Sequence, residues 1–269
     1  MDKMKYSTRD LCEIFSYQRG SGSRMEQIFI RKYLDSIPGI QTDRYGNKFK
    51  KIGSPDTMFT SHTDTVHPFN SHRQKVLVVD NYAYTNGRSV LGADDGTGVW
   101  LMLNMIHAKV PGLYVFQRHE EAGGVGSNYS AKRIRPSIKK VISLDRKGTT
   151  DIITHQGTRT CSDTFANALA KALGRNYRPS QWGTFTDSAN YADKVPECTN
   201  ISIGYYGGHT FQEKQDLKFA QWLAKKLTTI NFKALPVSRD PSRREYPSWS
   251  TQWSYSDYKP KKTNSHFYW

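Results

Sequence analysis

The chain has 269 residues, 36% of them hydrophobic, and a mean hydropathy of −0.71, which suits one large α/β domain together with a segment that contributes little to its core. Its formal net charge of +15 would attract polyanions such as nucleic acid, but the basic residues are spread along the whole chain, which favours an ordinary solvated surface. No apolar run approaches the ~20 residues that cross a bilayer, and the N-terminus lacks the apolar core of a signal peptide, so we expect a cytoplasmic protein without a membrane segment.

Two helical patterns come first, at residues 8–17 and 23–34, and the Pro-Gly pair at 38–39 ends the second. A helix at 99–107 follows a glycine-rich loop at 91–98. Between these helices, short apolar runs bounded by turn residues predict strands at 47–52, 57–61, 75–80 and 82–85.

The second half of the chain alternates strands with helices. One helix is bounded by Ser162 as its N-cap and by Gly174 just after Leu173, and another spans 214–230. Strands are predicted at 113–117, 140–144 and 200–206. This alternation predicts a mainly parallel central sheet with helices on both faces, which is a three-layer helix-sheet-helix α/β fold.

The composition changes after Leu235. Proline, serine, basic and aromatic residues dominate there and periodicity disappears, which predicts a catalytic domain at 1–235 and a basic, aromatic-rich tail at 236–269. Interleaved basic and aromatic side chains can bind single-stranded nucleic acid or glycans. Because no recognised binding fold surrounds them, docking on a neighbouring subunit or disorder is favoured over nucleic acid.

Acidic and histidine side chains follow the ends of the predicted strands. They are His62 and Asp64 after 57–61, Glu120 and Glu121 after 113–117, Asp145 after 140–144, and His209 after 200–206. Ligands of open α/β sheets bind outside the carboxyl ends of the strands, so these side chains can converge. Imidazole and carboxylate suit zinc, cobalt or manganese, and a carboxylate can bridge two ions ~3.5–4 Å apart.

None of the three cysteines is a candidate metal ligand. Cys12, Cys161 and Cys198 are an odd number at scattered positions with no C-x-x-C pair. This pattern argues against a disulfide framework and against a cysteine-built zinc site, so we expect reduced thiols.

Five short runs occur in the order in which the dinuclear zinc exopeptidases carry them, and the sequence resembles that family. They are H-T-D-T-V (62–66), L-G-A-D-D-G-T-G (91–98), H-E-E-A-G-G-V-G (119–126), S-L-D (143–145) and G-G-H-T (207–210). The family includes tripeptidase T, the single-domain zinc aminopeptidases and related deacylases. Each run alone is a weak signal, whereas five in order form a specific one.

The resemblance implies two divalent metal ions, zinc or else cobalt or manganese. Their implied ligands are His62 and Asp145 for one ion, Glu121 and His209 for the other, and Asp94 as the bridge. Asp95 competes for the bridging role but more readily supports the turn. The resemblance also implies a cis peptide bond after Asp94, Glu120 as the general base that activates a metal-bridging water, and Asp64 as the carboxylate that orients His62.

The run G-T-F-T-D-S-A-N at 183–190 resembles a loop near the substrate pocket of relatives. Thr186, Asp187 and Ser188 are therefore candidate substrate contacts, although an ordinary turn explains the run equally well. Many relatives insert a second domain within the spans that correspond to 62–94 or 145–209. Neither span has room for one, so we expect a single catalytic domain without a lid, which leaves the oxyanion donor open.

Three functions remain open at this point. The favoured one is an exopeptidase, above all an aminopeptidase, acting on small peptides. The alternative is a deacylase or amidohydrolase acting on N-acyl amino acids or wall-type amides with the same metal core. A non-catalytic binding protein that acts through its tail is disfavoured because the ligand set is intact. A homo-oligomer is compatible with each of them.

Overall fold

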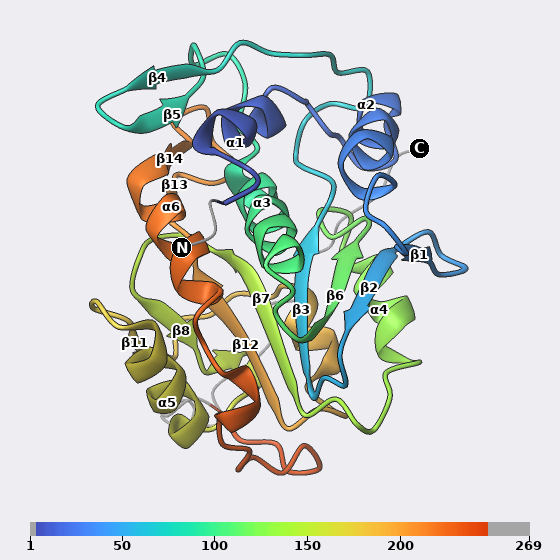
Figure 1. The fold of residues 1–269 in the computed structure, drawn as a ribbon, viewed down its shortest axis with the longest axis vertical. Coiled ribbons are helices and arrows are strands. Elements are labelled where there is room, and N and C mark those ends of the chain that lie inside the picture. The colour runs from blue at the N-terminus through green and yellow to red at the C-terminus, as the bar shows by residue number, and fades with distance from the viewer. Residues whose placement is uncertain (1–3, 247–269) are drawn as a thin grey trace, which may run out of the picture.

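A mixed sheet of eight strands is the centre of the computed structural model, which describes residues 4–246 (Figure 1). Strands β6, β3, β7 and β12 run parallel to one another in its middle, which confirms the predicted mainly parallel sheet. In spatial order the strands are β1 (Gln41–Thr42), β2 (Lys48–Ile52), β6 (Gly112–Gln117), β3 (Thr57–His62), β7 (Lys140–Arg146), β12 (Glu197–Ser202), β8 (Asp151–Ile153) and β11 (Arg178–Ser180).

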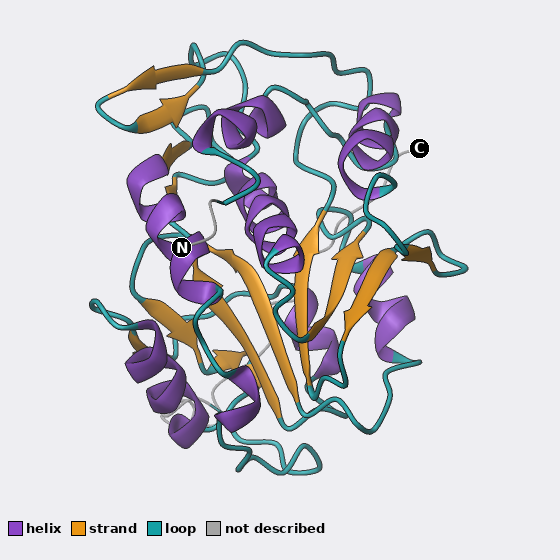
Figure 2. Ribbon diagram, in the orientation of Figure 1, coloured by secondary structure: helices purple, strands orange, loops and turns teal. Residues whose placement is uncertain are grey.

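Helices lie on both faces of this sheet, as predicted for a three-layer fold (Figure 2). On one face α3 (Ala93–His107) packs against β3 and β7, with α1 (Thr8–Phe15) and α6 (Leu217–Leu227) beside it. The 3-10 turn η2 (Asp187–Tyr191) packs on the other face, against α4 (Val125–Ala131).

The alternation of side chains along β6 shows how the two faces are filled. Tyr114 and Phe116 belong to the larger core beneath α3, whereas Val115 packs with Met58 and Tyr191 in a smaller core on the opposite face. Strand β3, between these cores, is buried along its whole length. The middle of the sheet is thus a rigid base, and His62 lies at its C-terminal edge.

The helix predicted at 99–107 begins earlier, at Ala93. Asp94 and Asp95 keep non-helical backbone angles in its first turn, and the bond between them is cis, as the family resemblance implies. Apolar periodicity cannot reveal this start, because the first turn is acidic and glycine-rich. The helix predicted after Ser162 is found as α5 (Asp163–Leu173), and Ser162 Oγ accepts the N–H of Phe165 at 3.0 Å.

The strand predicted at 200–206 is found at Glu197–Ser202, and the helix predicted at 214–230 is found at Leu217–Leu227, so both predictions have wrong bounds. Strand β12 ends at Ser202, and Gly204, with φ of +94°, turns the chain away from the main sheet. Helix α6 begins only after its N-cap Asp216. The residues in question belong to a second, four-stranded sheet made of β13 (Tyr205–Tyr206), β14 (Lys214–Asp216), β5 (Tyr82–Tyr84) and β4 (Leu77–Val79).

Several short elements were not predicted. α2 (Arg24–Phe29) continues as a π-helical turn, Ile30–Leu34, within the single helix predicted at 23–34. The strands β8 and β11 and the pair β9 (His155–Gln156) and β10 (Thr158–Arg159) have only two or three residues each. An alternating pattern cannot be recognised over so few positions.

The first residues of the predicted tail lie against the catalytic part of the chain. Glu197 Oε1 accepts the backbone N–H of Ser238 at 2.7 Å, and Arg239 Nη2 donates to the carbonyl of Val195 at 2.7 Å. The domain boundary at Leu235 stays a prediction, and the aromatic residues from Trp249 onward lie outside the described residues. Within residues 4–246, no helix combines the length and the apolar character needed to cross a membrane.

Candidate metal centre

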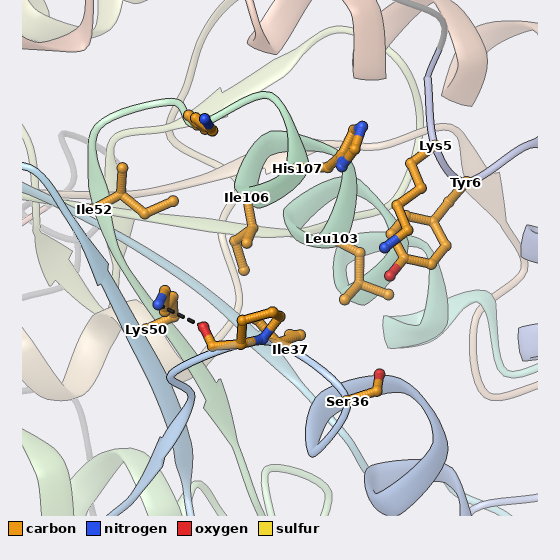
Figure 3. Close-up of a pocket in the computed structure, with 11 residues that line it drawn as sticks. Lys5, Tyr6, Ser36, Ile37, Lys50, Ile52, Leu103, Ile106 and His107 are labelled. Atoms are coloured by element: carbon orange, nitrogen blue, oxygen red, sulfur yellow. Dashed lines mark hydrogen bonds between the residues drawn. The ribbon is translucent and has the colours of Figure 1, made fainter.

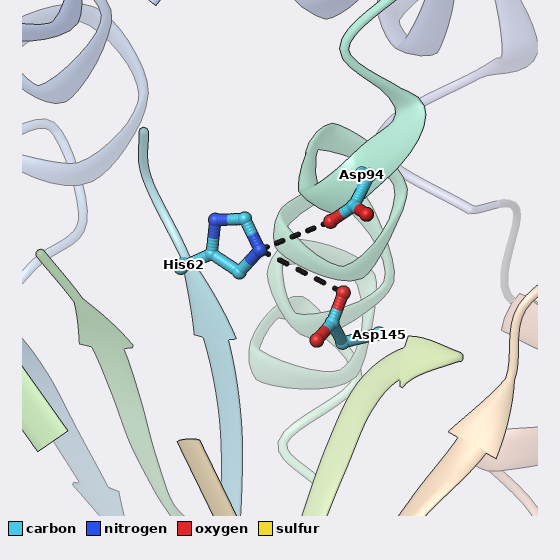
Figure 4. A group of neighbouring side chains, drawn as sticks. All are labelled: His62, Asp94 and Asp145. Carbon is cyan, nitrogen blue, oxygen red and sulfur yellow. Dashed lines mark hydrogen bonds and ion pairs between the residues drawn. The ribbon is translucent and has the colours of Figure 1, made fainter. Parts of the chain in front are cut away.

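Five of the predicted site residues meet at the C-terminal edge of the central strands. His62 is the last residue of β3, and Asp145 lies near the end of β7. Asp94 is in the first turn of α3, Glu121 is in the loop after β6, and His209 is in the loop between β13 and β14. Figure 4 shows the ring of His62 facing the carboxylates of Asp94 and Asp145.

The two oxygens of Asp94 face two different sets of side chains. Its Oδ1 lies 3.1 Å from His62 Nε2, which is also 3.6 Å from Asp145 Oδ1. Its Oδ2 lies 3.3 Å from His209 Nε2, which is also 3.1 Å from Glu121 Oε1. Each set brings three ligand atoms within 4.8 Å of one another, with Asp94 shared. This is the arrangement that a bridging carboxylate between two ions requires.

The donor atoms fit a divalent cation. Glu121 Oε1 and Asp145 Oδ1 are buried and accept no hydrogen bond. Buried carboxylate oxygens of this kind are costly unless a proton or a cation neutralises them. Two imidazoles and three carboxylates, without sulfur, are the ligands that zinc, cobalt and manganese accept.

Electrostatics in the cluster follow from this crowding of carboxylates. Burial, followed by the charge of Asp94, raises the pKa of Asp145 to about 7. The carboxylates of Asp94 and Glu121, which lie 3.3 and 3.1 Å from its Nε2, raise the pKa of His209 to about 11. Burial acts to raise the pKa of Asp94, but hydrogen bonds from His209 and His62 outweigh it, so that pKa lies below its ordinary value. The raised pKa values of Asp145 and His209 mean that the cluster retains protons where no cation is bound.

Glu120 lies on the rim of the same cluster, with its Oε2 4.0 Å from His62 Nε2. Burial raises the pKa of Glu120 to about 9, and the charges of Asp187, Asp145 and Glu121 add to the effect. Together with His62 and Glu121, Glu120 also forms a third group of possible ligand atoms within 4.8 Å. Its position therefore suits proton transfer and also allows direct metal contact.

Asp64 contacts His62 through its backbone carbonyl as well as its carboxylate. The Nδ1–H of His62 donates to the backbone carbonyl of Asp64 at 3.0 Å, while the carboxylate Oδ1 is 3.6 Å away. The carboxylate also accepts the backbone N–H groups of Glu120 and Glu121, both at 3.2 Å. Asp64 thus fixes the tautomer that leaves Nε2 of His62 free for a metal, and it also holds the loop of the two glutamates.

Asp95 turns away from the cluster. Its carboxylate accepts the backbone N–H of His62 at 3.1 Å and that of Gly98 at 3.0 Å. These contacts join the end of β3 to the first turn of α3, which is the supporting role expected of the second aspartate.

The three candidate substrate contacts are buried in the loop that precedes and enters η2. Thr186 Oγ1 donates to Asp145 Oδ2 at 2.5 Å, and the backbone N–H of Ser188 donates to Ser143 Oγ at 3.2 Å. Asp187 has a buried Oδ1 without a hydrogen bond, and burial raises its pKa to about 6. Thr186 and Ser188 are thus already engaged within the protein, and contact with a substrate stays a prediction for all three.

Three residues outside the predicted set also support the cluster. The hydroxyl of Tyr205 lies 3.0 Å from Asp94 Oδ2 and 2.9 Å from the carbonyl of Asp145. Glu213 accepts backbone hydrogen bonds from the loop of Asp94, and the fully buried Arg19 donates to backbone carbonyls nearby. Glu213 follows His209 by four positions, a spacing that could have drawn attention to it. Arg19 and Tyr205 carry no such signal.

A cavity of about 370 Å³ lies far from these residues, at the other end of α3 (Figure 3). Ile106 and His107, at the C-terminal end of that helix, line it together with Ile37, Lys50 and Lys109. Since α3 has fifteen residues, its two ends are ~20 Å apart. None of the described residues that line this cavity carries a carboxylate, so they offer no acidic metal ligand.

Comparison with known proteins shows that this chain resembles solved peptidases in fold. No protein-family model matches the sequence, and no curated protein matches it. Aminopeptidase PepT of Bacillus cereus superposes with a TM-score of 0.67 at 16% identity, over 84% of this chain and 97% of that one. A tripeptidase of Staphylococcus aureus superposes with a TM-score of 0.68 at 15% identity, over 85% and 97%.

The TET1 peptidase of Pyrococcus horikoshii, which can assemble into a tetrahedron or a large octahedral shell, gives a TM-score of 0.61 at 14% identity, over 82% and 98%. The chain therefore shares the α/β fold of these solved peptidases, which is the fold that the family resemblance implied.

Proposed function

We propose that the protein is a metallohydrolase that cleaves peptide bonds as an aminopeptidase. It holds two divalent ions, for which zinc is favoured over cobalt or manganese. One observation carries the proposal: the two oxygens of Asp94 face separate sets of ligands, His62 with Asp145 and His209 with Glu121. The likeness of fold to aminopeptidases and a tripeptidase supports the same chemistry. A homo-oligomer is part of the proposal, because the TET1 peptidase assembles into shells.

Ions bound by these ligands would acidify a water molecule and polarise the carbonyl of the scissile bond. Glu120 would take the proton of the attacking water and pass it to the leaving amine. The pKa of Glu120 is raised to about 9 by burial and neighbouring carboxylates, and positive charge in the cluster would lower it again. Asp64 holds the backbone of Glu120 and so keeps this carboxylate at the edge of the cluster.

A substrate panel tests this function. Metal-free protein is reloaded with zinc, cobalt or manganese and assayed with leucine p-nitroanilide, a free tripeptide and the N-acetylated form of each. Hydrolysis of the free amino-terminal substrates, lost with chelator, would establish the aminopeptidase. Preference for the acetylated forms would establish the deacylase instead. Chelator-insensitive hydrolysis, or none with any metal, would exclude both.

Metal binding is expected to release protons and to tighten as the pH rises. The pKa of His209 is raised to about 11 and that of Asp145 to about 7, so both hold protons at pH 6 in the metal-free protein. A ligand must lose its proton to bind a metal, and each proton released gives about a tenfold gain in affinity per pH unit. We expect the apparent affinity to rise at least about tenfold from pH 6.5 to 7.5.

Calorimetric titration in two buffers with different ionisation enthalpies measures the number of protons released. An affinity that stays the same between these pH values, with no protons released, would show that the metal binds elsewhere.

A further inference from the structure

A buried carboxylate, Glu213, ties together two of the loops that carry candidate ligands. The side chain is only 1% exposed. Its Oε1 accepts the backbone N–H of Asp94 at 3.0 Å, and its Oε2 accepts that of Gly92 at 2.8 Å. Its own backbone N–H donates to Thr210 O at 3.0 Å, within the turn that follows His209. Glu213 thus connects the loop of Asp94 to the turn that follows His209.

A buried arginine on the other side of Gly92 offsets the negative charge of Glu213. Arg19 has no exposed surface, and its Nη2 donates to the carbonyl of Gly92 at 3.2 Å. Its Nε donates to the carbonyl of Thr63, between His62 and Asp64, at 2.9 Å. Gly92 is therefore held at its carbonyl by Arg19 and at its N–H by Glu213.

Gly92 could not be replaced without disturbing this contact. Its φ is +75°, and a β-carbon there would lie 3.2 Å from Thr65 Cγ2 and 3.3 Å from His67 Cε1. The close approach lets two oppositely charged side chains reach one short loop from opposite sides. Buried charges of this kind are retained only where hydrogen bonds satisfy them, and here backbone groups supply those bonds.

The two candidate metal sites differ in how firmly the fold holds them. His62 and Asp145 belong to central strands of the sheet, and the His62 side chain is 1% exposed. His209 lies in a loop, has a positive φ of 64° and is 54% exposed at its side chain. A ligand on an exposed loop needs a supporting contact to keep its geometry. Glu213 and Tyr205, each four positions from His209, are the buried side chains nearest to it in the chain, and of the two only Glu213 accepts backbone N–H groups of the Asp94 loop.

We propose that Glu213, opposed by Arg19, is a positioning residue that sets the distance between Asp94 and His209 and thereby the affinity of the second metal site, formed by Glu121 and His209. This inference depends on the proposed function, because it presupposes two metal ions. The first site, formed by His62 and Asp145, is held by the sheet and does not need Glu213.

The test is Glu213→Gln. An amide of the same size has one carbonyl oxygen and can accept only one of the two N–H groups. Zinc is titrated calorimetrically into metal-free protein, and the circular dichroism melt checks folding. We expect the first ion to bind as in the wild type and the second about 10- to 100-fold more weakly. His209→Ala, which removes a ligand of the second site, identifies the binding event that is lost.

Thr97→Val is the matched control. Thr97 Oγ1 donates to Gln215 Oε1 at 2.7 Å and so links α3 to β14 through another buried hydrogen bond, which involves neither Asp94 nor His209. We expect both ions to bind this variant normally. Equal affinities in wild type and Glu213→Gln, or equal weakening of both ions, would overturn the inference. Wild-type protein that binds no metal would instead overturn the proposed function, and this inference with it.

Should Glu213→Gln not fold, Glu213→Asp supplies the same measurement. It keeps the charge that opposes Arg19 but is one methylene too short to reach both N–H groups. Weaker binding of the second ion alone is again expected, and wild-type affinity would count against the positioning role.

Discussion

Glu120→Gln is expected to lower kcat for peptide hydrolysis by about 10²- to 10⁴-fold and to leave both metal ions bound. Glutamine has the shape of glutamate but cannot accept the proton of the attacking water. The backbone N–H of Glu120 still donates to Asp64, so the loop should keep its position. Steady-state kinetics and metal analysis of the same preparation measure the two effects together.

Glu121→Gln is the matched variant, because the two glutamates are neighbours in one loop and both donate their backbone N–H to Asp64. Glu121 Oε1 is buried, accepts no hydrogen bond and lies 3.1 Å from His209 Nε2. We expect this variant to lose an ion as well as activity. If Glu120→Gln lost an ion while Glu121→Gln kept both, the roles of base and ligand would be reversed.

The convergence of the candidate ligands was predictable from sequence because it follows from strand direction. His62 and Asp145 follow or end strands that run parallel, and the carboxyl ends of parallel strands meet at one edge. Short apolar runs bounded by turn residues located those strands to within a few residues. The cis bond at Asp94 was expected from the resemblance alone, since no pattern in the chain reports it.

The supporting residues could not be predicted in the same way. Arg19 looks like any of the scattered basic residues, and only the fold shows that it is buried against Gly92. Glu213 stands directly before residues that have the pattern of a helix but form β14. Tyr205 falls within an apolar run that Gly204 divides between two sheets. The roles of these three residues depend on hydrogen bonds between segments that are distant in the sequence. Local sequence patterns do not predict such bonds.

Asp94→Asn is expected to lose at least one of the two ions and with it nearly all activity. Asp94 Oδ1 lies 3.1 Å from His62 Nε2 and Oδ2 lies 3.3 Å from His209 Nε2. An amide offers one oxygen in place of two and cannot bridge both sites. The loss of affinity should exceed the about 10- to 100-fold that removal of a supporting residue costs. Metal content after dialysis, with kcat on the same sample, measures both effects.

Asp95→Asn is the control that decides between the two aspartates. Its carboxylate accepts the N–H groups of His62 and Gly98, and an amide can satisfy only one of them. We therefore expect this variant to keep both ions and to lose about 1–3 kcal/mol of stability, the cost of one buried unsatisfied N–H. If Asp95→Asn lost the ions and Asp94→Asn kept them, the second aspartate would be the bridge. Of these two aspartates, Asp94 alone has its oxygens directed at two histidines, so the geometry favours Asp94 as the bridge.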